Sequence, residues 1–144
     1  MSESGFDIGL DDPGQAGVYF ATNDDLRTIA MAARDAGLLA RSIDLRGCKT
    51  KPTLLLRLSS ALDIPVGSGR NWDALSDQLR DLAWLPGSGY ALLFDDASDL
   101  RDADEASFDT LLDILQEAAT EWAARDIPFW AFLALAEDEF EQAD

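Results

Sequence analysis

The sequence contains no histidine and a single cysteine among its 144 residues. Without histidine, no imidazole is present to act as a general base, to complete a Ser–His–Asp or Cys–His nucleophile system, or to bind a metal ion. With Cys48 alone, an internal disulfide and a zinc site built from cysteines are also excluded. We interpret Cys48 as a small, partly buried side chain in a protein of a reducing compartment.

Basic residues are also scarce: 11 lysines and arginines stand against 28 aspartates and glutamates, giving a formal net charge of −17. Nucleic acids and anionic membranes attract proteins through lysine and arginine, so this charge excludes direct binding to either. A basic protein partner fits the charge better. The N-terminus, MSESGFD, lacks the apolar segment of a signal peptide, and no apolar run approaches the ~20 residues that span a bilayer. We therefore predict a cytoplasmic protein.

Length and composition predict one folded domain. With 47% hydrophobic residues, the chain is too apolar to be disordered. Apolar runs of strand length alternate with amphipathic segments, which is typical of an α/β fold with a small parallel sheet of three to four strands packed with helices. We expect a flexible acidic leader (1–16), an additional strand–helix unit (17–38), a main α/β domain (39–136) and an acidic tail (137–144).

Periodicity and capping residues place the individual elements. Strands are predicted at 17–21, 39–45, 90–94 and 129–135. Helices are predicted from a cap at Asn23 or Asp24 to Gly37, and at 53–63, 71–84 and 106–125. The strands at 90–94 and 129–135 are apolar throughout, as expected of parallel strands covered on both faces. The tryptophans lie on apolar stripes or runs and are interpreted as core residues: Trp72, Trp84, Trp122 and Trp130.

The helix that begins at Asn71 has the clearest pattern. At 100° per residue its apolar residues form one stripe and its acids lie on the other side; the apolar set is Trp72, Leu75, Leu79 and Leu82, and the acidic set is Asp73, Asp77 and Asp81. Asn71 is placed to cap the helix. Acids four residues apart repel by about 0.2–0.5 kcal/mol per pair, so this row of three acids, which we name the acidic ridge, is mildly unfavourable in the free helix. A solvated face partly relieved by Arg80 explains this ridge, and a binding surface is the alternative.

Two further motifs have the composition of ligand sites. The loop VGSGR (66–70) is rich in glycine, but no Gly-Lys-Ser/Thr follows it and no strand leads into it, so it is not a P-loop. Asp95 and Asp96 follow a predicted parallel strand, where ligands of α/β sheets gather, and such carboxylates are able to hold Mg²⁺. An alternative function is therefore a carboxylate–metal enzyme or a ligand-binding α/β protein, although a solvated acidic loop explains the same residues.

The segment NWDALSDQL (71–79), which follows Ile64–Pro65 and a short glycine loop, resembles the barstar family of intracellular ribonuclease inhibitors. The resemblance continues through Pro86, the strand at 90–94, LQEA at 115–118 and the final apolar strand. It covers the chain from about residue 39 to residue 136, which we name the barstar-like domain. The strand and helix before this domain would add to the family's small parallel sheet.

The resemblance implies that the protein binds a basic secreted ribonuclease and blocks its active site with the acidic helix and the loop before it. Carried over by position, Asn71 orders the loop and the helix start, Asp73 meets arginine or lysine at the rim, and Asp77 takes the place of the substrate phosphate. Glu117, on a neighbouring helix, adds a peripheral contact. The expected partner-binding residues are Gly67, Ser68, Gly69, Asn71, Asp73, Ser76, Asp77 and Glu117. The resemblance implies no catalytic residue, metal or cofactor.

Three positions depart from the family pattern. Gly67 and Ser68 stand where members commonly carry aromatic residues, and Ser76 replaces a frequent tryptophan. Those aromatic residues would supply buried contact area. Because they are missing, and because Arg70 places a positive charge beside the acids, we expect a diverged toxin nuclease rather than the family's standard ribonuclease. A module that binds a non-nuclease partner is a further alternative.

Overall fold

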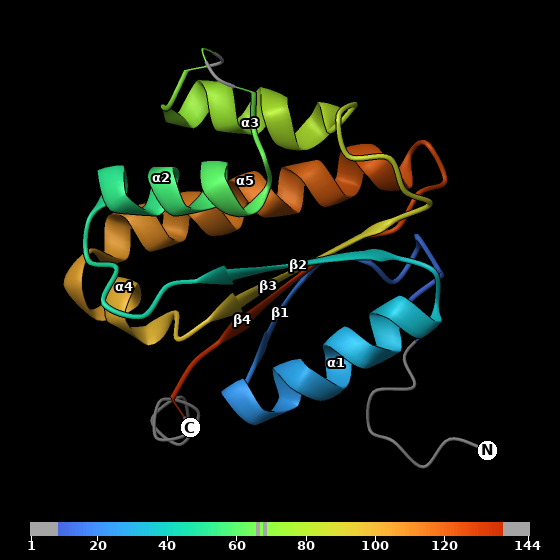
Figure 1. Ribbon diagram of the computed structural model, residues 1–144, viewed down its shortest axis with the longest axis horizontal. Coiled ribbons are helices and arrows are strands. Elements are labelled where there is room, and N and C mark those ends of the chain that lie inside the picture. The colour runs from blue at the N-terminus through green and yellow to red at the C-terminus, as the bar shows by residue number, and fades with distance from the viewer. Residues whose placement is uncertain (1–8, 66, 68, 137–144) are drawn as a thin grey trace.

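The computed structural model describes residues 9–65, 67 and 69–136 of the chain. One or two helices separate each strand from the next along it (Figure 1). In order, the elements are β1 (Val18–Ala21), α1 (Asn23–Asp35), β2 (Leu39–Asp44), α2 (Lys51–Ala61), α3 (Trp72–Asp81), β3 (Tyr90–Asp95), α4 (Ser98–Ala103), α5 (Glu105–Ala123) and β4 (Phe129–Ala134). Each predicted strand agrees with an observed one to within a residue at either end. The expected acidic tail (137–144) and the first half of the expected leader (1–8) lie outside the described residues.

One parallel sheet joins the strands of the described chain, in the order β1-β4-β3-β2. The predicted α/β class is therefore confirmed, with four strands in the sheet. β3 and β4 are central, and all their residues except Asp95 are buried. This position explains why their sequences are apolar without alternation. β1 and β2 form the edges of the sheet and expose part of their length.

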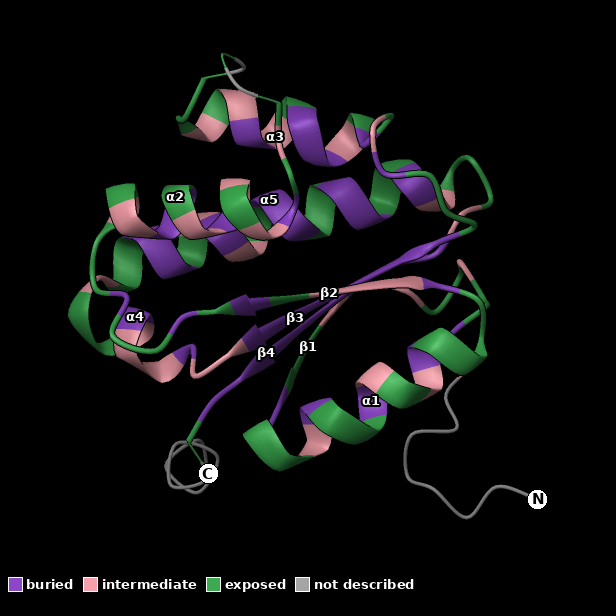
Figure 2. Ribbon diagram, in the orientation of Figure 1, coloured by how far each residue is buried: buried purple, intermediate pink, exposed green. Residues whose placement is uncertain are grey.

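Helices cover both faces of the sheet (Figure 1). α2, α3 and α5 lie on one side, with α3 outermost, and α1 lies on the other side. Buried residues follow the inward faces of the helices and the two central strands (Figure 2). The larger apolar cluster, which includes Phe94 and Leu115, lies between the sheet and the helices α2, α3 and α5. A smaller cluster, which includes Ile29 and Trp130, lies under α1.

The N-terminal strand–helix unit shares the core of the rest of the chain. β1 pairs with β4, and α1 buries Leu26, Ile29 and Ala33 against the sheet. Trp130, in β4, donates from its indole Nε1 to the carbonyl of Leu10 at 2.8 Å. This hydrogen bond fastens the segment before β1 to the centre of the sheet.

Two helices begin at threonine caps. The hydroxyl of Thr22 accepts from the N–H of Asp25 at 3.2 Å, so the predicted cap of α1 at Asn23 or Asp24 is wrong. Thr50 caps α2, which therefore starts two residues earlier than predicted. Its proline lies in the first turn, where the missing N–H has no helical partner in any case. Adjacent polar residues are similar enough as caps that local sequence does not decide between them.

Two segments near the candidate site differ from the prediction. α3 ends at Asp81 rather than near Trp84, because Leu82 adopts a left-handed backbone conformation with φ of 48°. The acidic segment after β3, expected to be a loop, contains the short helix α4, whose Leu100 is buried. A six-residue helix with one buried apolar residue is too short to show helical periodicity in the sequence.

The residues expected in the core are buried to different degrees. Cys48 is fully buried, and burial raises the pKa of its thiol. Trp122 and Trp130 are also buried. Trp72 and Trp84 pack against the larger cluster but remain partly exposed.

Candidate protein-binding site

α3 begins at a side-chain cap, as the sequence predicts. Asn71 has extended backbone angles, with φ of −147° and ψ of 174°, and its Oδ1 accepts from the N–H of Ala74 at 2.8 Å. This bond satisfies one of the N–H groups that the first turn of a helix leaves without a partner. The cap therefore fixes the start of α3 and the position from which Asp73 projects.

The glycine loop before α3 contacts the helix through Gly69. Gly67 and Gly69 have φ values of 89° and 91°, in the left-handed region that favours glycine. The carbonyl of Gly69 accepts a long hydrogen bond, 3.4 Å, from Nε2 of the buried Gln78. Ser68, which belongs to the expected binding set, lies outside the described residues. Both described glycines are exposed, and Gly69 lies next to Ala74 in the first turn of α3.

An exposed leucine borders this loop. Leu56, on α2, is 50% exposed and lines a shallow hollow of about 240 Å³ together with Pro65, Gly67, Gly69 and Arg70. The sequence does not reveal Leu56 as a surface residue, because α2 is only weakly amphipathic and its exposed face cannot be assigned from the pattern. The structure therefore places apolar surface beside a loop that lacks aromatic residues.

α3 exposes its acids and buries its leucines. Leu75 and Leu79 are buried, while Asp73, Asp77 and Asp81 are exposed. This distribution is the one predicted from the helical period. Ser76 is half-buried at the border of the two faces. The three acids consequently form one solvent-facing ridge along α3.

Arg80 makes two contacts with this ridge. Its Nη2 lies 2.7 Å from Oδ1 of Asp77, and its Nε donates to the carbonyl of Ser76 at 3.2 Å. The Asp77 side chain is 77% exposed and that of Arg80 is 38% exposed. An ion pair this open to solvent contributes about 0.2–1 kcal/mol. Arg80 thus relieves the repulsion within the ridge, as the sequence indicates, at little gain in stability.

One side chain of α5 and one just after its end hold the C-terminal end of α3. Trp122 donates from Nε1 to the carbonyl of Leu79 at 2.7 Å, and Arg125 donates from Nη1 to the carbonyl of Arg80 at 2.9 Å. Carbonyls in the last turn of a helix have no partner within it, so these bonds replace the missing ones. Both contacts join residues more than 40 positions apart, so no local pattern in the sequence predicts them.

Between α3 and α5 lies an open groove of about 520 Å³. Its lining residues are Arg80 from α3 and Asp113, Gln116, Glu117, Thr120 and Glu121 from α5. Oε1 of Glu121 also lies 3.8 Å from Nη2 of Arg125. The structure therefore brings the expected Glu117 to the same groove as Arg80, the ion-pair partner of Asp77. The glycine loop and Asn71 lie at the opposite end of α3.

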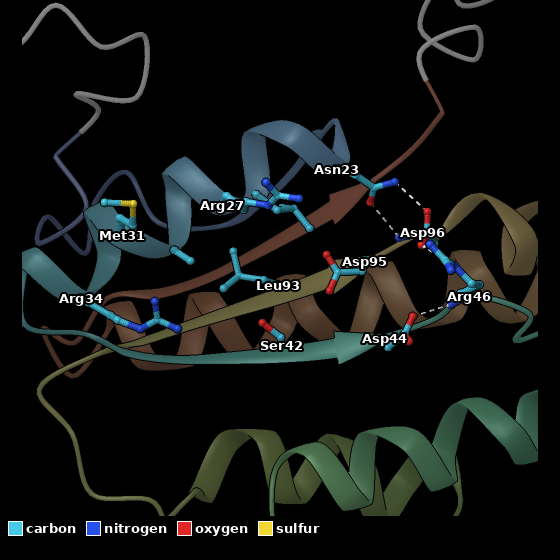
Figure 3. A pocket seen from close by; sticks show the side chains of 12 residues that line it. Asn23, Arg27, Met31, Arg34, Ser42, Asp44, Arg46, Leu93, Asp95 and Asp96 are labelled. Atoms are coloured by element: carbon cyan, nitrogen blue, oxygen red, sulfur yellow. Dashed lines mark hydrogen bonds and ion pairs between the residues drawn. The ribbon is translucent and has the colours of Figure 1, made fainter.

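A second group of carboxylates lies where β2 and β3 end, beside α1 (Figure 3). Asp44 and Asp95 are register partners on these neighbouring strands, and a cavity of about 760 Å³ adjoins them. Partial burial, together with the nearby carboxylates of Asp44 and Asp96, raises the pKa of Asp95. This environment disfavours the ionised form of Asp95, which is the form that would bind a cation.

Both carboxylate oxygens of Asp96 interact with protein side chains. Its Oδ1 accepts from Nδ2 of Asn23 at 2.6 Å, and its Oδ2 lies 3.3 Å from Nε of Arg46 (Figure 3). Within the residues that the structure describes, no three histidine, cysteine, aspartate or glutamate side chains are grouped so that they could hold a metal ion. The geometry therefore gives no support to the metal-site alternative at Asp95 and Asp96.

The α3 ridge lies within a segment that a protein-family profile recognises. The profile, described as Barstar (barnase inhibitor), matches residues 38–134, from just before β2 to the end of β4. The chain belongs to the barstar family. The barstar-family segment contains α3, the loop before it and α5, whereas β1 and α1 precede it. No curated protein matches the chain. Among the described residues, no helix is both long and apolar enough to cross a membrane.

Proposed function

We propose that this barstar-family protein binds a basic ribonuclease and blocks its active site with α3 and the loop before it. The observation that carries the proposal is that the family match includes α3, whose three acids all lie on its exposed face. The family description, an inhibitor of barnase, supplies the class of partner. The mechanism is blockade without chemistry: an acidic helix occupies a cationic cleft and excludes RNA from it.

The polar residues of α3 and α5 have different roles in this proposal. Asp77 takes the place of a substrate phosphate among the cationic side chains of the nuclease, and Asp73, one helical turn earlier, meets arginine or lysine at the rim. Asn71 acts through its cap, which fixes the first turn of α3. Glu117, across the groove on α5, adds a peripheral contact.

The loop contributes close approach and apolar area. Gly67 and Gly69 carry no side chains, so their main-chain groups are able to come near the partner. Ser68 and Ser76 offer hydroxyl groups that donate or accept hydrogen bonds. The exposed Leu56 supplies part of the apolar contact that aromatic residues of the loop would otherwise give.

The acidic charge of the protein would favour both its association with a basic nuclease and the stability of the complex. A net charge of −17 attracts a basic enzyme over long distances and raises the association rate, an effect that salt screens. Once bound, carboxylates removed from water and paired with arginine or lysine slow dissociation and select the partner. We therefore expect the association rate to fall steeply as the salt concentration rises.

The test is a pull-down from the lysate of the source organism, with the wild-type protein and an Asp73→Ala/Asp77→Ala variant as baits. Captured proteins are identified by mass and assayed for RNA cleavage. Removing one member of a buried ion pair at an interface weakens binding by about 2–5 kcal/mol, because the other charge is left buried and unpaired. We therefore expect the double variant to lose the nuclease. Asp35→Ala/Asp102→Ala, which removes two exposed acids from α1 and α4, is the control with the same change of charge.

The outcomes separate the possible functions. A basic nuclease captured by the wild type and by the control, but not by the α3 variant, supports both the function and the site. A nuclease captured equally by all three baits would support the function and contradict the site. A non-nuclease protein captured by all three would contradict the inhibitor function and favour a different interaction module.

A further inference from the structure

The carboxylate at the centre of the proposed interface is already paired within the free protein. Arg80 lies three residues after Asp77 and reaches it at 2.7 Å. In the proposed complex, the same carboxylate must meet a cation of the nuclease. A partner cation therefore competes with Arg80 for Asp77.

The position of Arg80 is defined by contacts beyond this ion pair. Its Nε donates to the carbonyl of Ser76, and its own carbonyl is held by Arg125. Its side chain also lines the groove that contains Glu117. Arg80 thus contacts one of the acids proposed to face the nuclease, Asp77, and lines the same groove as the other, Glu117.

The small side chain at position 76 favours this arrangement. Side chains four residues apart on a helix are neighbours, and a helical side chain extends over the turn before it. Arg80 therefore lies over the turn that contains Ser76 and Asp77. A bulky residue at position 76 would compete with the arginine for this space.

We infer that Arg80 is a specificity-determining residue, which weakens binding to uniformly cationic nucleases by occupying Asp77 and by adding a positive charge to the acidic face. This inference rests on the proposed function, because it assumes that α3 faces the active site of the partner. A nuclease that carries a carboxylate beside its cationic centre would accept Arg80, whereas one without such a carboxylate would be repelled by it.

The test uses barnase as the probe, because it is the enzyme named in the family description. Affinity is measured by calorimetry in 0.15 M salt for the wild type, Arg80→Gln, Arg80→Lys and Arg34→Gln. Arg34 is an exposed arginine of α1, on the other side of the sheet, so its substitution changes the net charge equally, from −17 to −18. Circular dichroism and thermal unfolding check that each variant is folded.

Arg80→Gln is expected to bind barnase at least about tenfold more tightly than the wild type, since it removes both the competitor and a like charge from the interface. Arg34→Gln should stay within about twofold of the wild type. Arg80→Lys, which keeps the positive charge, should stay much closer to the wild type than to Arg80→Gln. In an Asp77→Asn background, the gain from Arg80→Gln should shrink at least threefold, because the contested carboxylate is gone.

The result also distinguishes this inference from the proposed function. If Arg80→Gln and the wild type bind equally and Asp77→Asn weakens both, the function is supported and the role of Arg80 is refuted. If Arg80→Gln binds and the wild type does not, Arg80 is shown to exclude this nuclease. If no variant binds barnase, the role of Arg80 is refuted, and the proposed function is judged by the pull-down alone.

Discussion

Replacing Trp122 with phenylalanine tests how firmly α3 is held to the rest of the protein. The indole Nε1 of Trp122 donates to the carbonyl of Leu79 at 2.7 Å, and both residues are buried. Phenylalanine keeps an aromatic ring at this position but removes the N–H. The Leu79 carbonyl, in the last turn of α3, would then have no partner from α5.

The expected destabilisation has two parts. A buried carbonyl without a hydrogen-bond partner costs about 1–3 kcal/mol. The smaller ring gives up roughly 40 Å² of buried apolar area, which at ~25 cal/mol per Å² adds about 1 kcal/mol. We therefore expect Trp122→Phe to lower the free energy of unfolding by about 2–4 kcal/mol. For a chain of this length, that corresponds to a decrease in Tm of about 6–12 °C.

Trp84→Phe is the matched control. Trp84 donates from Nε1 to the carbonyl of Leu62 at 2.8 Å. Leu62 is buried, but the ring of Trp84 is partly exposed, so water is able to enter from that side and replace the lost donor. Urea unfolding measures both variants, and amide hydrogen exchange shows which elements open. Trp122→Phe should lower the free energy of unfolding by at least about 1 kcal/mol more than the control does. In this variant, amide hydrogens should exchange faster in α3 than in β3 or β4. Equal losses in the two variants would refute the argument that α5 holds α3 through this bond.

Two further predictions concern the cap of α3 and the carboxylates beside α1. Asn71→Ala should lower the free energy of unfolding by about 1 kcal/mol, whereas Asn71→Asp, which keeps a hydrogen-bond acceptor, should lower it much less. If the alanine variant and the wild type have equal thermal stability, the role of the cap is contradicted. The pKa of Asp95 is raised in the folded protein, so the folded state binds the Asp95 proton more tightly than the unfolded chain does. The protonated Asp95 side chain therefore adds to the free energy of unfolding below the ordinary pKa of 3.8, and this contribution is lost as pH rises through the raised pKa. Asp95→Asn should therefore stabilise the protein at pH 7 and bring no gain below pH 3.8, as measured by urea unfolding at both pH values; a gain that is the same at both would contradict the pKa shift.

The features that the sequence predicts well are local. Two unbroken apolar runs indicate covered parallel strands, and the 100° spacing of leucines and aspartates along α3 identifies its buried and exposed faces. Asn71 directly precedes the apolar stripe and caps the helix as expected. Such features depend on residues within one or two turns of each other, so a single sequence contains the necessary information.

The features that the sequence does not predict depend on distant partners. Asn23 is a reasonable cap for α1, but its side chain hydrogen-bonds with Asp96, 73 residues away, and the neighbouring Thr22 caps the helix instead. The contact between Trp122 and Leu79 likewise joins two helices that are separate in the sequence. Polar side chains can serve several partners, and only the packed structure selects one of them.

The pairing of β1 with β4 has a consequence for synthesis on the ribosome. Val18 is one of the first residues of the fold to be made, yet its partner Ala131 follows about 110 residues later. At roughly 5–20 residues per second, the N-terminal strand waits for roughly 6–20 seconds before its neighbour exists. During that time the apolar face of α1 also lacks the part of the sheet that β4 supplies. β1, which lies outside the family match, is therefore made before the other three strands of the sheet, and it pairs only after the last of them has been made.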